Sequence, residues 1–291
     1  MSVKFAALLA GACLIGSGAS ASPVVLRDAL QREVTFASPP QRIVTLLPSL
    51  TETVCALGAC DRLVATDRYS DWPPAVRALP KAGGIDDAQI ELLVSLKPDL
   101  ILISRSQRIS GRLDALGLRC FALVTDSYAD IARNVTRIGA MLALEERAAR
   151  LNASIRDSVL EIGAQALAQR HGPGPTVYFE ADGPPYAAGP ASFIGELLER
   201  LGARNIVSAD QGPFPALNPE YVVRHNPDVI FVSPAEATHL AERPGWGEIR
   251  AVREQRVCSF VPAIRDSIIR PGPRVAEGMR ALGACLTRVS P

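Results

Sequence analysis

The residue types that most often carry catalysis or bind metal ions are sparse in this chain of 291 residues. Its three histidines, His171, His225 and His239, are scattered, and no cysteines or histidines have the spacing of a zinc site. The sequence contains no Walker motif, no GxSxG, no HExxH and no GxGxxG after a predicted strand. The formal net charge of +1 gives no electrostatic reason to bind nucleic acid. We therefore expect neither an enzyme nor a resident metal or cofactor.

Two acidic residues, in contrast, occupy matching positions in a repeated pattern. The stretch IELLVSLKPDLILIS at 90–104 aligns with PEYVVRHNPDVIFVS at 219–233, so that Glu91 matches Glu220. Each copy predicts a short helix, a Pro-Asp turn and an apolar strand. The identity at this position, seven residues before the proline in both copies, indicates two similar lobes that each carry an acid at the same place.

The regions around the two copies alternate between strands and helices. In the first half, the strands RIVTLL, RLVAT, DLILIS and LRCFALV are separated by the helices PSLTETVCALG, DDAQIELLVSL and RLDALG. After a Gly-Pro stretch at 171–175 the pattern resumes with TVYFE, ASFIGELLERLG, PEYVVRH, DVIFVS and RVCSFV, and the helix PRVAEGMRALGACLTR follows. This alternation is typical of α/β folds with mostly parallel sheets.

A long helical segment separates the two alternating regions. Ser127 and Asp130 have the spacing of a capping box, and the part from Glu145 to Arg170 would measure about 39 Å as one helix. We predict an α/β fold of two lobes joined by a single long backbone helix, with a ligand cleft between the lobes. The predicted limits are 42–125 for the N-lobe, 126–172 for the helical linker and 173–291 for the C-lobe, within one binding domain of 42–291.

The first 21 residues are typical of a secretory signal. Lys4 precedes an apolar stretch too short to span a bilayer, and small residues end the segment at Ala21. We expect cleavage there and export to the periplasm, with lipid attachment at Cys13 as the alternative. An odd number of cysteines would remain, and we expect Cys55 and Cys60 to form a disulfide because they flank a helix end.

Several stretches together resemble the periplasmic binding proteins for cobalamin and iron chelates, the helical-backbone class of substrate-binding components of ABC importers. They are RIVTLLPSLTETVCALG, YSDWPP, IELLVSLKPDLIL, GPPYAAG, PEYVVRHNPDVIFV and SIIRPGPRVAEG, and they are most similar to the cobalamin binders. The resemblance implies two lobes bridged by a rigid helix, with ligand bound between them and no catalytic step. It implies a monomer that captures a corrinoid or related iron chelate and delivers it to an ABC permease dimer.

The resemblance also implies which residues bind the ligand and the permease. The implied ligand positions are Tyr69, Tyr186, Phe214, Asp266 and Arg270. Aromatic faces can cover a flat ligand, while an acid and an arginine can hydrogen-bond to its polar edge; an ion pair between Asp266 and Arg270 is compatible with that role. Glu91 and Glu220 are implied to dock on arginines of the two permease subunits. Ordinary first-turn acids, favoured by the helix dipole, are the alternative reading.

Departures from the family pattern leave the ligand open. The chain reads GGIDDAQIE and SRSQ where the cobalamin binder has aromatic residues, so we expect a more polar pocket. Arg105 and Arg108 would then meet an anionic ligand, and a haem or ferric-siderophore binder of the same fold is the alternative. An exported α/β enzyme without a recognisable motif is the alternative from another class. Trp72 has two readings, loop packing or ligand contact, and Trp246 is expected to anchor a short helix in the second lobe.

Overall fold

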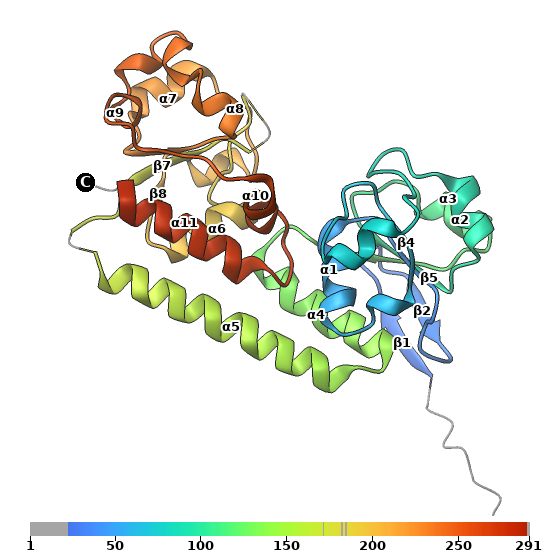
Figure 1. Ribbon diagram of the computed structural model, residues 1–291. Helices are drawn as coiled ribbons and strands as arrows, with labels where there is room; N and C mark the ends of the chain where they lie inside the picture. Colours follow the sequence, from blue (N-terminus) through green and yellow to red (C-terminus); the bar gives the residue numbers. More distant parts are fainter. Residues whose placement is uncertain (1–22, 171, 182, 184, 290–291) are drawn as a thin grey trace, which may run out of the picture.

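The computed structural model describes residues 23–170, 172–181, 183 and 185–289. Two α/β lobes lie side by side above one long helix (Figure 1). The predicted signal segment at 1–21, Cys13 and His171 lie outside the described residues. Within the described ranges, none of the helices has the length and apolar character needed to cross a membrane.

The N-lobe is built on a four-stranded parallel sheet. Its strands are β3 (Ile43–Thr45), β4 (Leu63–Thr66), β5 (Leu100–Ser104) and β6 (Cys120–Leu123), in the spatial order β4-β3-β5-β6. The connecting helices are α1 (Pro48–Ala56), η1 (Cys60–Arg62), η2 (Pro74–Ala78), α2 (Ile90–Leu96) and α3 (Ser110–Ala115). Every residue of β5 and β6 is buried, because helices cover both faces of a parallel sheet.

The C-lobe repeats this arrangement. Its strands are β7 (Thr176–Phe179), β8 (Arg204–Asn205), β9 (Val229–Phe231) and β10 (Val257–Cys258). They are all parallel, and their order β8-β7-β9-β10 matches the N-lobe strand for strand. The remaining elements are α6 (Phe193–Arg200), η3 (Ala209–Gln211), α7 (Pro219–His225), α8 (Pro234–Ala237), η4 (Leu240–Glu242), η5 (Trp246–Glu248), α9 (Arg250–Arg253) and α10 (Pro262–Ile269). The predicted α/β fold of two lobes is therefore confirmed.

Two helices carry the chain from one lobe to the other. α4 (Tyr128–Leu142) begins at a capping box, in which the Asp130 carboxylate accepts a hydrogen bond from the Ser127 backbone N–H at 2.9 Å. After a left-handed residue at Ala143, α5 (Glu145–Ala168) runs for 24 residues, or about 36 Å. It packs against α4 and against α11 (Val275–Val289), and it extends beneath both lobes (Figure 1).

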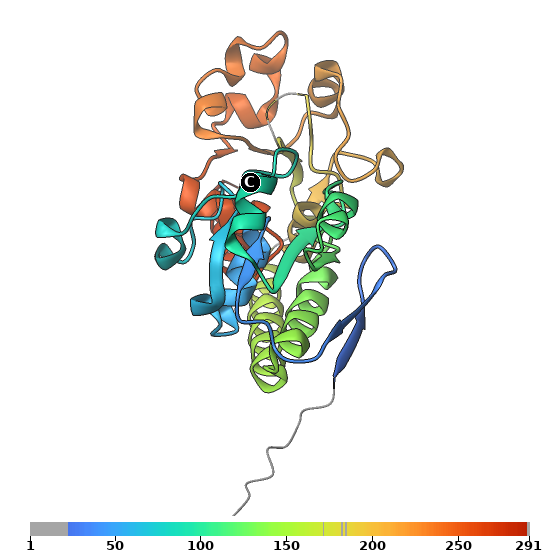
Figure 2. The ribbon, with the colours of Figure 1, turned by 90° about the vertical axis from the view of Figure 1, so that its right-hand side faces the viewer.

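An N-terminal hairpin was not predicted from the sequence. β1 (Val24–Arg27) and β2 (Glu33–Phe36) pair in antiparallel fashion beside the N-lobe (Figure 2). The Asp28 carboxylate accepts hydrogen bonds from the turn, including the Arg32 backbone N–H at 2.9 Å. Burial would raise the pKa of Asp28, but the hydrogen bonds from Arg32 and Ala122 lower it overall. The hairpin is held to β6 by the bond from the Ala29 N–H to the Ala122 carbonyl, at 2.9 Å.

Two disulfides lie in different lobes. Cys55 and Cys60 are bonded at the end of α1, as the sequence suggested. The second disulfide joins Cys258 in β10 to Cys285 in α11, a pairing that was not predicted from the sequence. Cys120 is the free cysteine among the described residues, and it is buried. The second disulfide ties the edge strand of the C-lobe sheet to the helix that packs on α5.

Candidate functional site

Four large aromatic side chains remain strongly exposed on loops of the two lobes. Tyr69 and Trp72 follow β4 and are 58% and 40% exposed. Tyr186 and Phe214 belong to C-lobe loops, and each is 49% exposed. Other aromatic residues, such as Tyr178, are almost fully buried. Half-exposed aromatic faces on ordered loops are surfaces on which a flat ligand can lie.

The loop that carries Tyr69 is held by a buried carboxylate that the sequence analysis did not identify. Asp67, which is 1% exposed, accepts a hydrogen bond from the Tyr69 N–H at 2.8 Å and another from the Ser70 hydroxyl. Lys81 reaches the Ser70 carbonyl from the other side at 2.6 Å. Burial raises the pKa of Asp67, although these hydrogen bonds and the Lys81 charge oppose the shift. The position of Tyr69 is therefore set by a buried polar network.

The structure brings Tyr186 and Phe214 onto neighbouring loops. Tyr186 pairs with Ala216 in an antiparallel bridge. The Leu217 N–H donates to the Pro185 carbonyl at 2.8 Å, which extends the contact between the two loops. The loops that carry the two aromatic residues predicted for the C-lobe therefore lie side by side.

Arg270 is the residue that links the predicted positions of the two lobes. It follows α10, and its guanidinium lies 2.8 Å from Asp266 of the same lobe. From the N-lobe, the Glu52 carboxylate lies 3.0 Å away, Asp71 lies 2.9 Å away, and the Tyr69 carbonyl accepts a hydrogen bond at 3.1 Å. Tyr69, Asp266 and Arg270 are thus brought together, and the sequence analysis missed Glu52 and Asp71 as members of this cluster.

The electrostatics of the Arg270 cluster are dominated by burial. The Glu52 side chain is 3% exposed, and the cost of burying its charge raises its pKa despite the nearby Arg270 and Arg274. Burial also raises the pKa of Asp266, against the opposing effect of Arg270. The Asp71 side chain, in contrast, is 51% exposed. One carboxylate of the cluster is therefore inaccessible, while another faces solvent.

The segment that follows Arg270 lies directly on the N-lobe. A Cβ atom on Gly272 would stand 3.3 Å from the Cβ of Ser49 in α1, so the two backbones are in close contact. The Arg274 guanidinium lies 3.7 Å from Glu52 and 4.5 Å from the centre of the Trp72 ring. Trp72 is therefore both packed against an arginine and partly exposed, which is compatible with either of its predicted roles.

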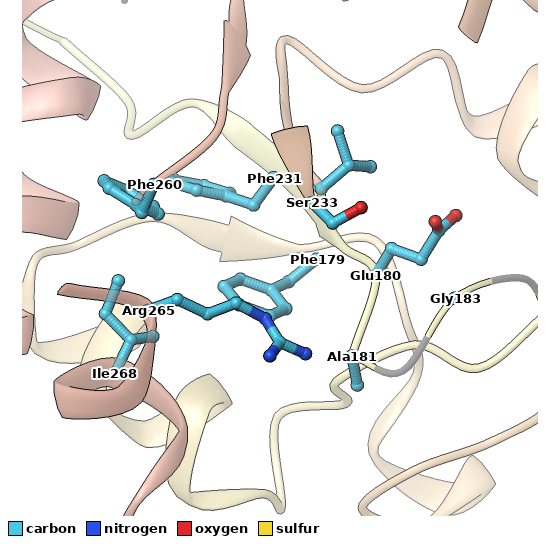
Figure 3. Close-up of a pocket in the computed structure, with 10 residues that line it drawn as sticks. Phe179, Glu180, Ala181, Gly183, Phe231, Ser233, Phe260, Arg265 and Ile268 are labelled. Carbon is cyan, nitrogen blue, oxygen red and sulfur yellow. The ribbon is translucent and has the colours of Figure 1, made fainter. Parts of the chain in front are cut away.

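A pocket of about 390 Å³, its open mouth included, lies at the carboxyl edge of the C-lobe sheet (Figure 3). Phe179, Phe231 and Phe260 form its apolar wall, with neighbouring ring centres 5.6 and 6.3 Å apart. Figure 3 shows the guanidinium of Arg265 beside the Phe179 ring, and the Glu180 carboxylate turned away from the rings.

The charge of Glu180 is compensated inside the C-lobe. Arg243 donates to its two carboxylate oxygens at 2.7 and 3.1 Å and also contacts Glu236. Burial and the adjacent Glu180 raise the pKa of Tyr178. Trp246 is buried in η5, where its ring meets Tyr178 edge-on at 5.7 Å. These contacts place Trp246 in the C-lobe core, away from the exposed aromatic surface.

Glu91 and Glu220 lie in the first turns of α2 and α7, and both are exposed. The Glu91 side chain is 88% exposed and has Arg112 at 4.0 Å. Glu220 has no comparable ion pair among the described residues. Its backbone N–H donates to the side chain of the N-cap residue Asn218 at 2.9 Å. Both acids are therefore free to meet another molecule, and neither belongs to the Arg270 cluster.

Arg105 and Arg108 differ in their surroundings. Arg105 lies 2.5 Å from Asp126, so its charge already has a partner. Arg108 is exposed, and the described residues offer it no ion pair. Of the two arginines suggested for an anionic ligand, Arg108 is the one whose charge is available.

The histidines that can be described have local partners. The Nδ1 atom of His225 lies 2.8 Å from the Tyr221 carbonyl, and that of His239 lies 3.0 Å from Glu242. In the part of the chain that the structure describes, no three His, Cys, Asp or Glu residues converge in a way that could hold a metal ion.

Comparison with known proteins gives consistent matches along the chain. Residues 43–262 match the family described as periplasmic binding protein. An uncharacterized ABC transporter substrate-binding lipoprotein of Bacillus subtilis is 31% identical over 89% of this chain and 84% of its own length. A cobalamin-binding protein of Halobacterium salinarum is 30% identical over 88% of this chain and 72% of its own length.

Solved structures with the same fold include a vitamin B12-binding protein and a heme-binding protein. The periplasmic vitamin B12-binding protein BtuF of Vibrio cholerae superposes with a TM-score of 0.73 and 25% identity, covering 86% of this chain and 98% of its own. A periplasmic heme-binding protein of Pseudomonas aeruginosa has a TM-score of 0.74 and 25% identity, covering 84% of this chain and 92% of its own.

Proposed function

The chain belongs to the periplasmic binding protein family, and we propose that it is the solute-binding component of an ABC importer. The observation that carries the proposal is the Arg270 cluster, in which the two lobes meet beside an exposed aromatic residue of the N-lobe. A solute-binding protein captures a ligand and releases it to a permease, so it needs no nucleophile or general base. The proposed role therefore uses no resident cofactor, and any metal arrives as part of the cargo.

We propose a corrinoid, or a related iron chelate, as the ligand. Exposed faces of Tyr69, Tyr186 and Phe214 would cover a flat macrocycle. Arg270 and Asp266 would hydrogen-bond to amide or carboxylate groups at its edge. The similarity to cobalamin-binding relatives supports a corrinoid.

Haem is the second candidate ligand. Arg108 favours it, because this exposed arginine has no ion pair among the described residues. Haem carries two carboxylates that could meet it, whereas the corrin edge carries mainly neutral amides. The heme-binding structure of similar fold supports this choice. A ferric siderophore with acidic groups would meet the same arginine.

We propose that Glu91 and Glu220 contact the permease, one on each lobe. A permease of two equivalent subunits would present two equivalent arginine sites, which suits two acids at equivalent positions. Exposed ion pairs contribute only about 0–1 kcal/mol each, so these contacts would set the register of docking more than its affinity. The mature protein would act as a monomer in the periplasm, or from a lipid anchor at Cys13.

Ligand titration tests the proposed function. The chain from residue 22 onward would be titrated separately with cyanocobalamin, haemin and a ferric catecholate siderophore, while tryptophan fluorescence and ligand absorbance are followed. We expect saturation at one ligand per chain for at least one of them. Trp72 is exposed and Trp246 is buried, so Trp72→Phe should remove most of the fluorescence change but leave the absorbance change. Absence of binding by all three compounds would overturn the proposal.

A further inference from the structure

The Arg270 guanidinium has two different kinds of carboxylate partner on the same nitrogen. Its Nη1 atom lies 3.0 Å from Glu52 and 2.9 Å from Asp71. The Glu52 side chain is 3% exposed, and the Asp71 side chain is 51% exposed. An incoming ligand can reach the second carboxylate but not the first.

Glu52 is held in place by the packing of one lobe on the other. It lies in α1 of the N-lobe, and 218 residues of sequence separate it from Arg270. The loop between α10 and α11 lies on the side of the C-lobe that faces α1 (Figure 1), where Gly272 contacts Ser49. A buried carboxylate without its arginine would strongly destabilise the folded protein. We therefore expect the Glu52–Arg270 pair to remain intact when ligand binds.

The buried pair is also incompletely satisfied. The second oxygen of Glu52 and the hydroxyl of Ser49 are both buried, and neither has a hydrogen-bond partner among the described residues. A buried carboxylate normally has its remaining lone pairs satisfied. The pair is therefore not an arrangement of maximal stability, but its bonded oxygen fixes the direction of the Arg270 guanidinium.

Building on the proposed function, we propose that Glu52 is a positioning residue for ligand binding and that Asp71 is a placeholder for the ligand. Glu52 holds the Arg270 guanidinium, whose side chain is 11% exposed, in contact with Asp266 and the Tyr69 carbonyl. In the ligand-free protein Asp71 fills the outward-facing hydrogen-bond position on Nη1. On binding, a carboxylate or amide oxygen of the ligand replaces the Asp71 carboxylate, which moves into solvent. The Glu52–Arg270 pair stays intact during this exchange.

The two carboxylates then have opposite effects on ligand affinity. Glu52→Gln should weaken binding by about tenfold or more, because the guanidinium loses the charged group that orients it. Asp71→Asn should leave affinity unchanged or strengthen it by about two- to fivefold, because a competitor of the ligand is weakened. If the cluster served only to hold the lobes together, both substitutions would weaken binding or neither would.

The test uses cyanocobalamin and haemin with the wild type, E52Q, D71N and two matched controls. Glu146 and Asp157 form exposed ion pairs on α5, so E146Q and D157N make the same chemical changes far from the Arg270 cluster. Affinity, association rate and dissociation rate would be measured by stopped-flow fluorescence, with circular dichroism to confirm folding. The expected result is faster dissociation for E52Q, equal or slower dissociation for D71N, and wild-type values for the controls.

The outcomes separate the two proposals. If the wild type binds neither these compounds nor a ferric siderophore, the proposed function fails. If the wild type binds ligand and D71N weakens binding as E52Q does, the proposal that a ligand oxygen replaces the Asp71 carboxylate is wrong. Equal affinity of E52Q and the wild type would show that Glu52 does not position Arg270. Because the Asp71 side chain is exposed, D71N is expected to fold. Its affinity alone would therefore test the replacement of Asp71 by ligand if E52Q does not fold.

Discussion

The two lobes use the same Pro-Asp turn to hold the start of their first strand, β3 or β7, but they reinforce it differently. In the N-lobe, the Asp99 carboxylate accepts hydrogen bonds from the Gln41 and Arg42 N–H groups, both at 2.8 Å. In the C-lobe, the Asp228 carboxylate accepts from the N–H and the hydroxyl of Thr176, again both at 2.8 Å. The repeated Pro-Asp sequence therefore does one structural task twice: its carboxylate holds the start of the adjacent parallel strand.

The helices before the two turns also end alike. Lys97 and Asn226 each adopt a left-handed conformation with φ of 46°. Asparagine tolerates this conformation better than lysine does, and the Asn226 side chain also accepts a hydrogen bond from the Arg250 N–H at 2.7 Å. Arg250 reaches Asp228 as well, at 2.6 Å. The Pro-Asp turn of the C-lobe is thus more buried, and its polar side chains have more hydrogen-bond partners. The backbone conformation is the same in both lobes.

Within the repeat, the residues of the Pro-Asp turn differ from the two matched acids in what they contact. The Pro-Asp turn is used inside each lobe, where it contacts only that lobe. Glu91 and Glu220 lie in the first turn of each helix, and both are exposed. The comparison therefore shows that one repeat can carry both a carboxylate with a role in folding and an exposed acid at the position proposed to meet the permease.

The largest expected effect concerns the two exposed acids. Charge reversal at both, in Glu91→Lys with Glu220→Lys, should reduce permease-dependent uptake to about a tenth or less, because the arginines of the partner would be repelled. If the two acids are equivalent, Glu91→Lys alone and Glu220→Lys alone should reduce uptake by similar amounts. Uptake into cells, together with ligand affinity of the purified variants, measures this. Glu146→Lys on α5 is the matched control. A loss of ligand affinity would contradict a docking role for the two acids. A loss of uptake from only one of the two single variants would contradict their equivalence.

The disulfides should make the lobes unequal in stability. The cysteines of the C-lobe bond are 27 positions apart, and those of the N-lobe bond are 5 apart. Since a larger closed loop restricts the unfolded chain more, removal of the C-lobe bond should cost about 3.5 kcal/mol and removal of the N-lobe bond about 2 kcal/mol. Urea unfolding of the two double-serine variants measures the difference, with Cys120→Ser as control. Equal losses would contradict the loop-size argument.

The two Pro-Asp turns provide a finer comparison. Asp228→Ala should lower the free energy of unfolding by about 3 kcal/mol and Asp99→Ala by about 1.5 kcal/mol, because hydrogen bonds to a charged group are stronger when the group is buried and paired. Urea unfolding of both variants tests the order. A larger loss for Asp99→Ala would mean that burial does not decide the strength of the turn.

The pH dependence of the Asp228 contribution checks the same idea. Burial would raise the pKa of Asp228, but the hydrogen bonds from Thr176 and the Arg250 charge lower it overall. A lowered pKa means that the stabilisation is present above the ordinary aspartate value of about 3.9 and is lost as pH falls through the folded pKa. The stability difference between wild type and Asp228→Asn should therefore be full at pH 7 and shrink below about pH 4. A stability difference that does not change with pH would contradict the idea that the ionised Asp228 carboxylate stabilises the turn.

Features that depend on neighbouring residues could be predicted from the sequence. The capping box at Ser127 and Asp130 was expected because its two residues are three positions apart. The two α/β lobes and the connecting helices followed from apolar periodicity, and the family match confirms the resemblance. The N-terminal hairpin was missed because its short strands are only half buried, so they carry little hydrophobic signal.

The sequence by itself determined the lobes, their order along the chain and the types of residue available for binding. Only the tertiary structure decided what those residues meet. Arg270 and Asp266, four residues apart, were expected to bind ligand, with an ion pair between them as a compatible reading, yet Glu52 and Asp71 were not expected as partners of Arg270. No local pattern can reveal such pairs, because they exist only where the packing of two lobes brings distant charges together and removes water from one of them.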